Sequence, residues 1–267
     1  MTTLFDTLAA RMGIRAEQTD GTWTGVLDPY PELVAHGVVR ISVWALMADM
    51  VGGMTADAVA GEDWTFTTDL SVRAPALRVP GRVVGTSRAL RMGRHDLATE
   101  VWMREDDGSL FAYSHAGFTR LARRPGDNPK PTVDGPAQER WTDRALLDAP
   151  LATLAGCDVV DPARGRLEVE LTDVLRNPAG AMQGAMVALV GEVSAESMAT
   201  HHIGVPQVVT DLDVRYLAMG RIGPIVSTAT LIGPPEAGSV AVELRDRGNG
   251  DRVVSALLAR TAPAPTA

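Results

Sequence analysis

The sequence predicts an α+β protein built from two copies of one unit. Three observations predict it. Matching residues recur along the chain at a shift of about 143 positions, helix and strand patterns follow the same order in each half, and a polar, proline-rich segment separates the halves. Each half contains one long apolar helix and several alternating segments, so a sheet is available to cover each helix.

The repeat is clearest in a short run of residues. Residues 68–73 read Thr-Asp-Leu-Ser-Val-Arg and residues 210–215 read Thr-Asp-Leu-Asp-Val-Arg, at a shift of 142. Gly37 matches Gly180, and Asp49 matches Glu192, both at a shift of 143. Ordered matches along the whole length indicate an internal duplication.

The elements follow from hydrophobic periodicity, with strands bounded by Gly, Pro and Asp. In the first half we expect a short helix at 4–12, a strand at 23–27, a long helix at 41–58, and strands at 64–73, 81–92, 95–104 and 110–121. In the second half we expect a short helix at 144–154, a strand at 167–171, a long helix at 185–200, and strands at 208–216, 223–232, 239–245 and 252–261. The expected domains are 1–124 and 141–267, joined by a linker at 125–140.

Composition narrows the class of protein. The chain of 267 residues has a formal net charge of −8, which disfavours a general nucleic-acid or anionic-membrane surface. Cys157 is the single cysteine, which excludes an internal disulfide and a cysteine metal cage. The first ten residues do not resemble a signal peptide, and acids interrupt both of the most apolar stretches. We therefore expect a soluble, cytoplasmic protein.

Each long helix carries an acid in a stripe of small residues, where a surface helix would carry charged side chains. The stripes are Ser42, Ala45, Asp49, Gly52, Gly53 and Ala56 in the first helix, and Ala185, Ala188, Glu192, Ala195 and Ala199 in the second, with Glu196 beside them. Neither acid has a basic partner on its own helix. A desolvated carboxylate has a raised pKa and is typical of a functional site. The alternative is that both acids lie idle in water at a helix edge.

A glycine-rich turn precedes the second long helix. It reads Asn-Pro-Ala-Gly-Ala-Met-Gln-Gly-Ala over residues 177–185. Its glycines permit close approach of a ligand to the backbone, and the free amides at the helix start can stabilise a developing negative charge. The alternative is an ordinary turn before a helix.

The pattern Asn177-Pro178-x-Gly180-x-x-Gln183-Gly184, followed by an acid, resembles the hotdog-fold acyl-CoA thioesterases, a group that includes phenylacetyl-CoA and hydroxybenzoyl-CoA thioesterases. Residues 209–217 and the later Gly-Pro pair at 223–224 are similar to the strand and turn that follow in that family. The resemblance implies a double hotdog, with two repeats that each wrap an antiparallel sheet around a long central helix. Two departures stand out: the family usually has His-Gly-Gly where this chain has Gln-Gly-Ala at 183–185, and the first half has Arg-Ile-Ser at 40–42.

Spacing along the second helix shows how a site could be assembled. Gly184 and Glu192 are eight residues apart, about 12 Å along one helix, so one thioester carbonyl cannot contact both. An amide from one helix must therefore pair with an acid from the other, which is also what the resemblance implies. We expect a first site that joins Asn177, Gln183 and Gly184 to Asp49, and a second, weaker site that joins the turn with His36, Gly37 and Arg40 to Glu192.

The predicted function is hydrolysis of an acyl-CoA or acyl-carrier thioester. The Gly184 amide polarises the carbonyl, Asp49 acts as nucleophile or general base, and Thr68 and Thr210 are candidate helpers. Four arginines are candidate contacts to the phosphates of coenzyme A, with ordinary surface solvation as the alternative: Arg73, Arg78, Arg215 and Arg221. No metal or cofactor is expected.

Two other functions stay open, namely a non-catalytic acyl-thioester binder and an acyl-thioester dehydratase or hydratase. The missing His-Gly pattern favours the binder, and the absence of an Asp-x-Asn-Pro-x-His run counts against the dehydratase. A homodimer of the chain is expected only by analogy.

Overall fold

The structure is a computed structural model that describes residues 7–122 and 145–266. The expected linker at 125–140 lies outside the described residues, as do the first residues of the two expected short helices, 4–6 and 144. The helices are α1 (Leu8–Arg11), α2 (Ile41–Ala60), α4 (Leu151–Leu154) and α5 (Gly184–Ile203).

The strands alternate with these helices in the order expected for a repeated unit. Those of the first half are β1 (Arg15–Thr19), β2 (Thr22–Leu27), β3 (Val34–Ala35), β4 (Val38–Val39), β5 (Trp64–Arg73), β6 (Val83–Met92), β7 (Asp96–Glu105) and β8 (Leu110–Leu121). Those of the second half are β9 (Val159–Asp161), β10 (Arg166–Val169), β11 (Gln207–Tyr216), β12 (Ile225–Leu231), β13 (Ser239–Asp246) and β14 (Arg252–Pro263).

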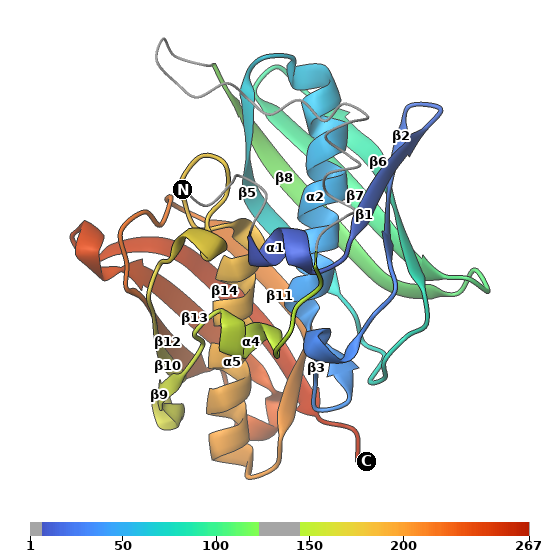
Figure 1. Cartoon of the computed structure of the whole chain (residues 1–267). Coiled ribbons are helices and arrows are strands. Elements are labelled where there is room, and N and C mark those ends of the chain that lie inside the picture. Colours follow the sequence, from blue (N-terminus) through green and yellow to red (C-terminus); the bar gives the residue numbers. More distant parts are fainter. Residues whose placement is uncertain (1–6, 123–144, 267) are drawn as a thin grey trace.

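One large antiparallel sheet of 12 strands runs through the molecule, so the predicted α+β class is confirmed. Its order is β1-β2-β6-β7-β8-β5-β11-β14-β13-β12-β10-β9, and the second half of this order mirrors the first. Strands β5 and β11 are hydrogen-bonded neighbours at the centre, so the two halves of the chain share one continuous sheet (Figure 1). The short hairpin of β3 and β4 stands apart from it.

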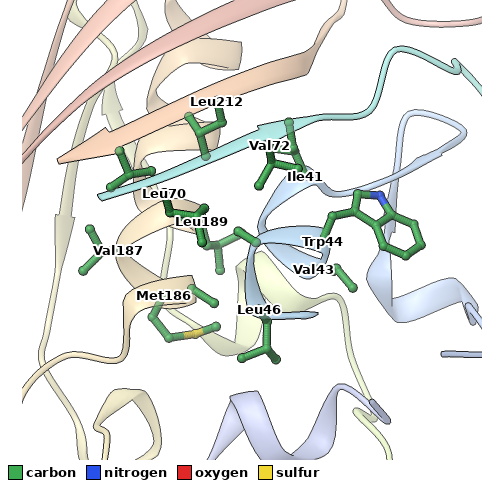
Figure 2. Packing of buried hydrophobic residues seen from close by; sticks show 14 of the residues in the cluster. Ile41, Val43, Trp44, Leu46, Leu70, Val72, Met186, Val187, Leu189 and Leu212 are labelled. Carbon is green, nitrogen blue, oxygen red and sulfur yellow. The ribbon is translucent and has the colours of Figure 1, made fainter. Parts of the chain in front are cut away.

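The two long helices lie against this sheet. Helix α2 contacts β5, β6, β7 and β8, helix α5 contacts β11, β12, β13 and β14, and the two helices also contact each other. Figure 2 shows Leu70 and Val72 of β5 and Leu212 of β11 near buried side chains of both helices. By length and hydropathy alone α2 would suffice to cross a membrane, but more than half of it is buried inside the described structure, which is usual for the core helix of a soluble protein.

The repeated hexapeptide forms the seam between the halves. Arg73 of β5 forms ion pairs with Asp211 and Asp213 of β11, and Arg215 of β11 lies 4.0 Å from Asp69 of β5. Because the strands are antiparallel, the acid of one copy meets the arginine of the other. The strongest repeat in the sequence therefore lies where the two halves of the chain meet.

The sequence predicted most of the elements but missed the edge strands. Strands β5 and β8 have the expected bounds, and both long helices start within one residue of expectation. The missed strand β1 is a polar edge strand, Arg-Ala-Glu-Gln-Thr, without the alternation that signals a half-buried strand. Helices α1 and α4 each have four residues within the described chain, fewer than expected.

Candidate active site

A β-bulge in β5 determines which threonine faces helix α2. Thr67 pairs with Phe118 of β8 and Asp69 pairs with Gly117, so the residue between them, Thr68, has no partner of its own in the ladder. An extra residue reverses the alternation of side chains before and after it. Thr67 therefore joins Leu70 on the face that meets α2, although an unbroken alternation would place it on the opposite face.

Asp49 of α2 is held on both of its carboxylate oxygens. The Thr67 hydroxyl donates to Oδ1 at 2.5 Å, and the Gln183 side-chain amide donates to Oδ2 at 3.3 Å. Burial raises the pKa of Asp49, the hydrogen bond from Thr67 lowers it, and the charge of Asp57 raises it further, with a net upward shift. The carboxylate is thus placed in two fixed contacts and has an increased proton affinity.

Gln183 also caps the start of α5. Its side-chain oxygen accepts from the amides of Ala185 and Met186, and its amide nitrogen faces Asp49. Among the described residues, the Gly184 amide has no hydrogen-bond acceptor. An α-helix has a partial positive charge at its first amides. A free amide at the start of a long helix is therefore present beside the acid.

Asp49 and Gly184 belong to different halves of the chain but lie together. A Cβ atom built on Gly184 would lie 3.4 Å from Asp49 Oδ2 and 3.3 Å from the hydroxyl of Tyr216. The Tyr216 hydroxyl donates to the Gly184 carbonyl at 3.1 Å. Burial and the nearby Asp49 charge raise the pKa of Tyr216 well above its usual value. The phenol is thus neutral at physiological pH and supports the first turn of α5.

These groups line a pocket of about 460 Å³. Its walls come from α2, β5 and β8 on one side, and from residues 177–187 and 216–220 on the other. Much of the lining is apolar, with Met50, Met54, Phe66 and Phe118 among the side chains. Within the described ranges, no group of three or more His, Cys, Asp or Glu side chains is placed to hold a metal ion.

Asn177 shapes the turn that precedes α5. Its side-chain oxygen accepts from the amides of Ala179 and Ala181, and its backbone amide donates to the Ala181 carbonyl. Asn177 also lines the pocket. Its oxygen therefore holds the loop in shape, whereas Gln183 contacts Asp49 directly.

The matching position in the other half is closed. Glu192 of α5 is 1% exposed and accepts from the amides of Ile41 and Ser42, each at 3.1 Å. These are the first amides of α2, and Ile41 matches Gly184 at the repeat shift of 143. Glu192 therefore accepts from the first amides of α2, whereas the equivalent Gly184 amide at the start of α5, beside Asp49, has no acceptor in the described chain.

Arg40 completes this closed cluster. Its guanidinium lies 3.5 Å from Glu192 and 3.1 Å from Glu196, and Glu196 also accepts from the Val209 amide. Burial and the neighbouring Glu192 raise the pKa of Glu196 to about 7, although Arg40 opposes the shift. Arg40, expected to contact substrate, is thus bound to two carboxylates from the other half. We name Arg40, Glu192 and Glu196 the ionic cluster.

The remaining expected residues form no hydrogen bond with Asp49 within the described chain. His36 and Gly37 form the exposed turn between β3 and β4, and neither lines the pocket. Thr68 lines the pocket but donates to Asp69, and Thr210 donates to Asp211.

The four arginines have mainly structural partners. Arg73 and Arg215 belong to the seam, and Arg78 forms an ion pair with Glu105. Arg221 is exposed and contacts Met219, a residue of the pocket wall. Within the described chain the Arg221 guanidinium forms no ion pair, although the backbone amide of Arg221 donates to the Asp246 carboxylate.

Sequence reasoning missed Thr67 and Tyr216. Both lie next to residues that it did name. An unbroken alternation from Leu70 would place Thr68, and not Thr67, on the face that meets α2, and the bulge has no signature in this strand. A signal for Tyr216 was present, since it directly follows the repeated hexapeptide at 210–215.

Comparison of the structure with solved structures finds the same fold in thioesterases. An acyl-ACP thioesterase from Bacteroides thetaiotaomicron has a TM-score of 0.60 at 12% identity, covering 91% of this chain and 98% of its own. A 12:0-ACP thioesterase from Umbellularia californica has a TM-score of 0.61 at 10% identity, covering 92% and 99%. The tesB protein of Mycobacterium avium subs. paratuberculosis has a TM-score of 0.59 at 14% identity, covering 97% and 98%. The chain has the fold of these thioesterases.

This thioesterase fold agrees with the expected resemblance to tandem hotdog thioesterases. No protein-family model and no curated protein matches the chain in sequence. The likeness therefore concerns the fold, and the chemistry rests on the geometry around Asp49.

Proposed function

We propose that the protein hydrolyses acyl thioesters of coenzyme A or of an acyl carrier in the pocket that contains Asp49. One observation carries the proposal: a carboxylate with a raised pKa lies beside a free helix-terminal amide in a largely apolar pocket. A thioester needs a base or nucleophile, a donor for the developing oxyanion, and room for an acyl group. All three converge here.

In the proposed mechanism, the Gly184 amide donates to the carbonyl oxygen of the thioester, and the dipole of α5 supports the negative charge that forms there. Asp49 removes a proton from an attacking water, while Thr67 and Gln183 hold its carboxylate in place. Collapse of the tetrahedral intermediate expels the thiolate. Direct attack by Asp49 on the thioester carbonyl is the other route: it expels the thiolate and leaves a mixed anhydride between the acyl group and Asp49. When water then attacks the Asp49 carboxyl carbon, an Asp49 oxygen leaves with the product acid in a single turnover.

The proposed architecture is two hotdog repeats, at 1–124 and 141–267, with one working site. The mirrored strand order supports the two repeats. The ionic cluster supports a single site, because Glu192 and Arg40 saturate the helix start that a second site would need. The proposal includes that the enzyme is soluble and acts in the cytoplasm.

The test is thioester hydrolysis followed with a thiol-trapping dye on a panel of acyl-CoAs. Asp49→Asn is expected to lose most of the rate, and Glu192→Gln to keep the rate per folded molecule. A purified, folded protein that hydrolyses no acyl-CoA and no acyl-carrier thioester would contradict the proposal, as would equal losses in the two variants.

A further inference from the structure

Tyr216 contacts the start of α5 from the end of β11. It is the last residue of that strand and lines the pocket. Its phenol hydroxyl donates to the Gly184 carbonyl at 3.1 Å. A tyrosine hydroxyl has one hydrogen to donate, and its oxygen can also accept. Since the hydrogen is used on Gly184, the phenol oxygen is left as an acceptor beside the pocket.

The Asp49 carboxylate and the Tyr216 hydroxyl flank one space beside Gly184. A Cβ atom at residue 184 would lie 3.4 Å from Asp49 Oδ2 and 3.3 Å from the phenol oxygen. Burial and the charge of Asp49 raise the pKa of Tyr216, so the phenol stays neutral next to the acid. Because residue 184 is glycine, its own side chain does not fill this space. Two hydrogen-bond acceptors from different halves of the chain therefore border it.

Two acceptors around one space match the two hydrogens of a water molecule. An ionised carboxylate only accepts, and the hydrogen of this phenol is already engaged. A water held by the base alone rotates freely about its single hydrogen bond. A second acceptor stops this rotation and aims the lone pair of the water, and a fixed orientation of the nucleophile lowers the barrier to attack.

We propose that Tyr216 is a further catalytic residue, whose phenol oxygen accepts one hydrogen of the attacking water while Asp49 accepts the other. This inference rests on the proposed function and on its general-base route. Asp49 takes one proton, the water oxygen bonds to the thioester carbon, and the carbonyl electron pair moves to the oxygen at the Gly184 amide. The second hydrogen stays on the new hydroxyl group, facing Tyr216. When the intermediate collapses, the thiolate leaves and takes up the proton held by Asp49.

Hydroxylamine tests the inference, because it competes with water for the same thioester and gives a hydroxamate in place of the acid. It is already a strong nucleophile at neutral pH, so its attack depends less on being oriented by a second acceptor. For Tyr216→Phe we expect the kcat of hydrolysis to fall about 10-fold with KM unchanged, and the ratio of hydroxamate to acid to rise about as much. A reaction without enzyme supplies the background to subtract.

Tyr113→Phe is the matched control, because it makes the same change in a phenol that donates to Glu100 and does not line the pocket. It should keep the rate and the product ratio of the unaltered enzyme. Thermal unfolding of each variant verifies that it is folded.

Gly184→Ala is a second, independent variant. It keeps the amide N–H and places a methyl group in the space between the two oxygens. We expect hydrolysis to fall at least about 10-fold. Binding of a non-hydrolysable S-alkyl-CoA thioether, measured by calorimetry, should stay unchanged.

A product ratio that stays constant in Tyr216→Phe while both rates fall would show that Tyr216 only holds the start of α5, and would overturn the inference. Full hydrolysis by Tyr216→Phe or by Gly184→Ala would overturn it as well. In each of these results, hydrolysis by the unaltered chain leaves the proposed function standing. A folded, unaltered chain that hydrolyses no thioester contradicts the proposed function itself, and the inference falls with it.

Discussion

Replacing Arg40 with leucine removes the single cation of the ionic cluster. The exposed fractions of the three side chains are 13% for Arg40, 1% for Glu192 and 10% for Glu196, so the charges have little solvent to replace the lost partner. Removing one partner of a buried ion pair costs about 3–5 kcal/mol. For a chain of this size, that corresponds to a decrease in Tm of roughly 10 °C.

The assay is urea unfolding followed by circular dichroism, with Arg73→Leu as the matched control. Arg73 also forms ion pairs with two acids, but its side chain is 42% exposed. A solvated pair contributes about 1 kcal/mol or less. We therefore expect the decrease in the free energy of unfolding to be several-fold larger in Arg40→Leu than in Arg73→Leu. A second control adds Glu192→Gln and Glu196→Gln to Arg40→Leu, and should recover most of the loss because no buried charge is left unpaired.

The loss in Arg40→Leu should depend on pH. The pKa of Glu196 is raised to about 7 in the folded protein, above its ordinary value of 4.5. The contribution of Glu196 to the free energy of unfolding is therefore fully present below the pKa that Glu196 has in the unfolded chain. It is lost as the pH rises through about 7. Without Arg40 the pKa of Glu196 rises further, so the deficit of the variant should grow between mildly acidic and mildly alkaline pH. Equal stability of Arg40→Leu and Arg73→Leu at pH 8 would refute the reasoning.

Three further outcomes follow from the site and its supports. Thr67→Val removes the hydrogen bond that lowers the pKa of Asp49, so the acidic limb of the kcat/KM profile should move to higher pH. The control is Thr68→Val, because the Thr68 hydroxyl contacts a different acid and its loss should leave the acidic limb in place. Identical pH profiles for the two variants would contradict the role assigned to Thr67. Asp49→Asn should reduce kcat by about 10²- to 10⁴-fold in the same hydrolysis assay and still fold, and a rate near that of the unaltered enzyme would remove Asp49 from the mechanism. Gly52→Ala should cost about 1–3 kcal/mol in urea unfolding, because the new Cβ would lie 2.5 Å from a buried threonine hydroxyl, whereas Gly53→Ala has 3.6 Å to its nearest neighbour and should be tolerated.

Much of the fold was predictable because its signals are local. The apolar periodicity of the two long helices and the alternation of the central strands are visible in the sequence, and the structure has them within a few residues. The repeat also predicted a duplicated unit. The polar edge strand β1 was not predictable, because Ala16 is the one buried residue among its five and the strand therefore shows no alternation of apolar and polar residues.

The site was predictable only in part, for two physical reasons. Asp49 and Gly184 were named from a pattern of small residues and a turn, which are local, and the structure brings them together. The partner of each acid is non-local: nothing around Arg40 indicates that it reaches Glu192 from the other half. The bulge at Thr68 changes which side chains of β5 face α2, so alternation along the strand could not indicate Thr67.

The shared sheet has a consequence for how such a chain can change by mutation. An assembly of two identical subunits must carry every substitution at both equivalent places. In this chain the equivalent positions are encoded separately, so Asp49 and Glu192 can change independently while the contact between β5 and β11 keeps the two halves together. The acid of one half can thus serve the proposed reaction while the acid of the other half holds the two halves together. A symmetric dimer of half-length chains could not separate these two roles.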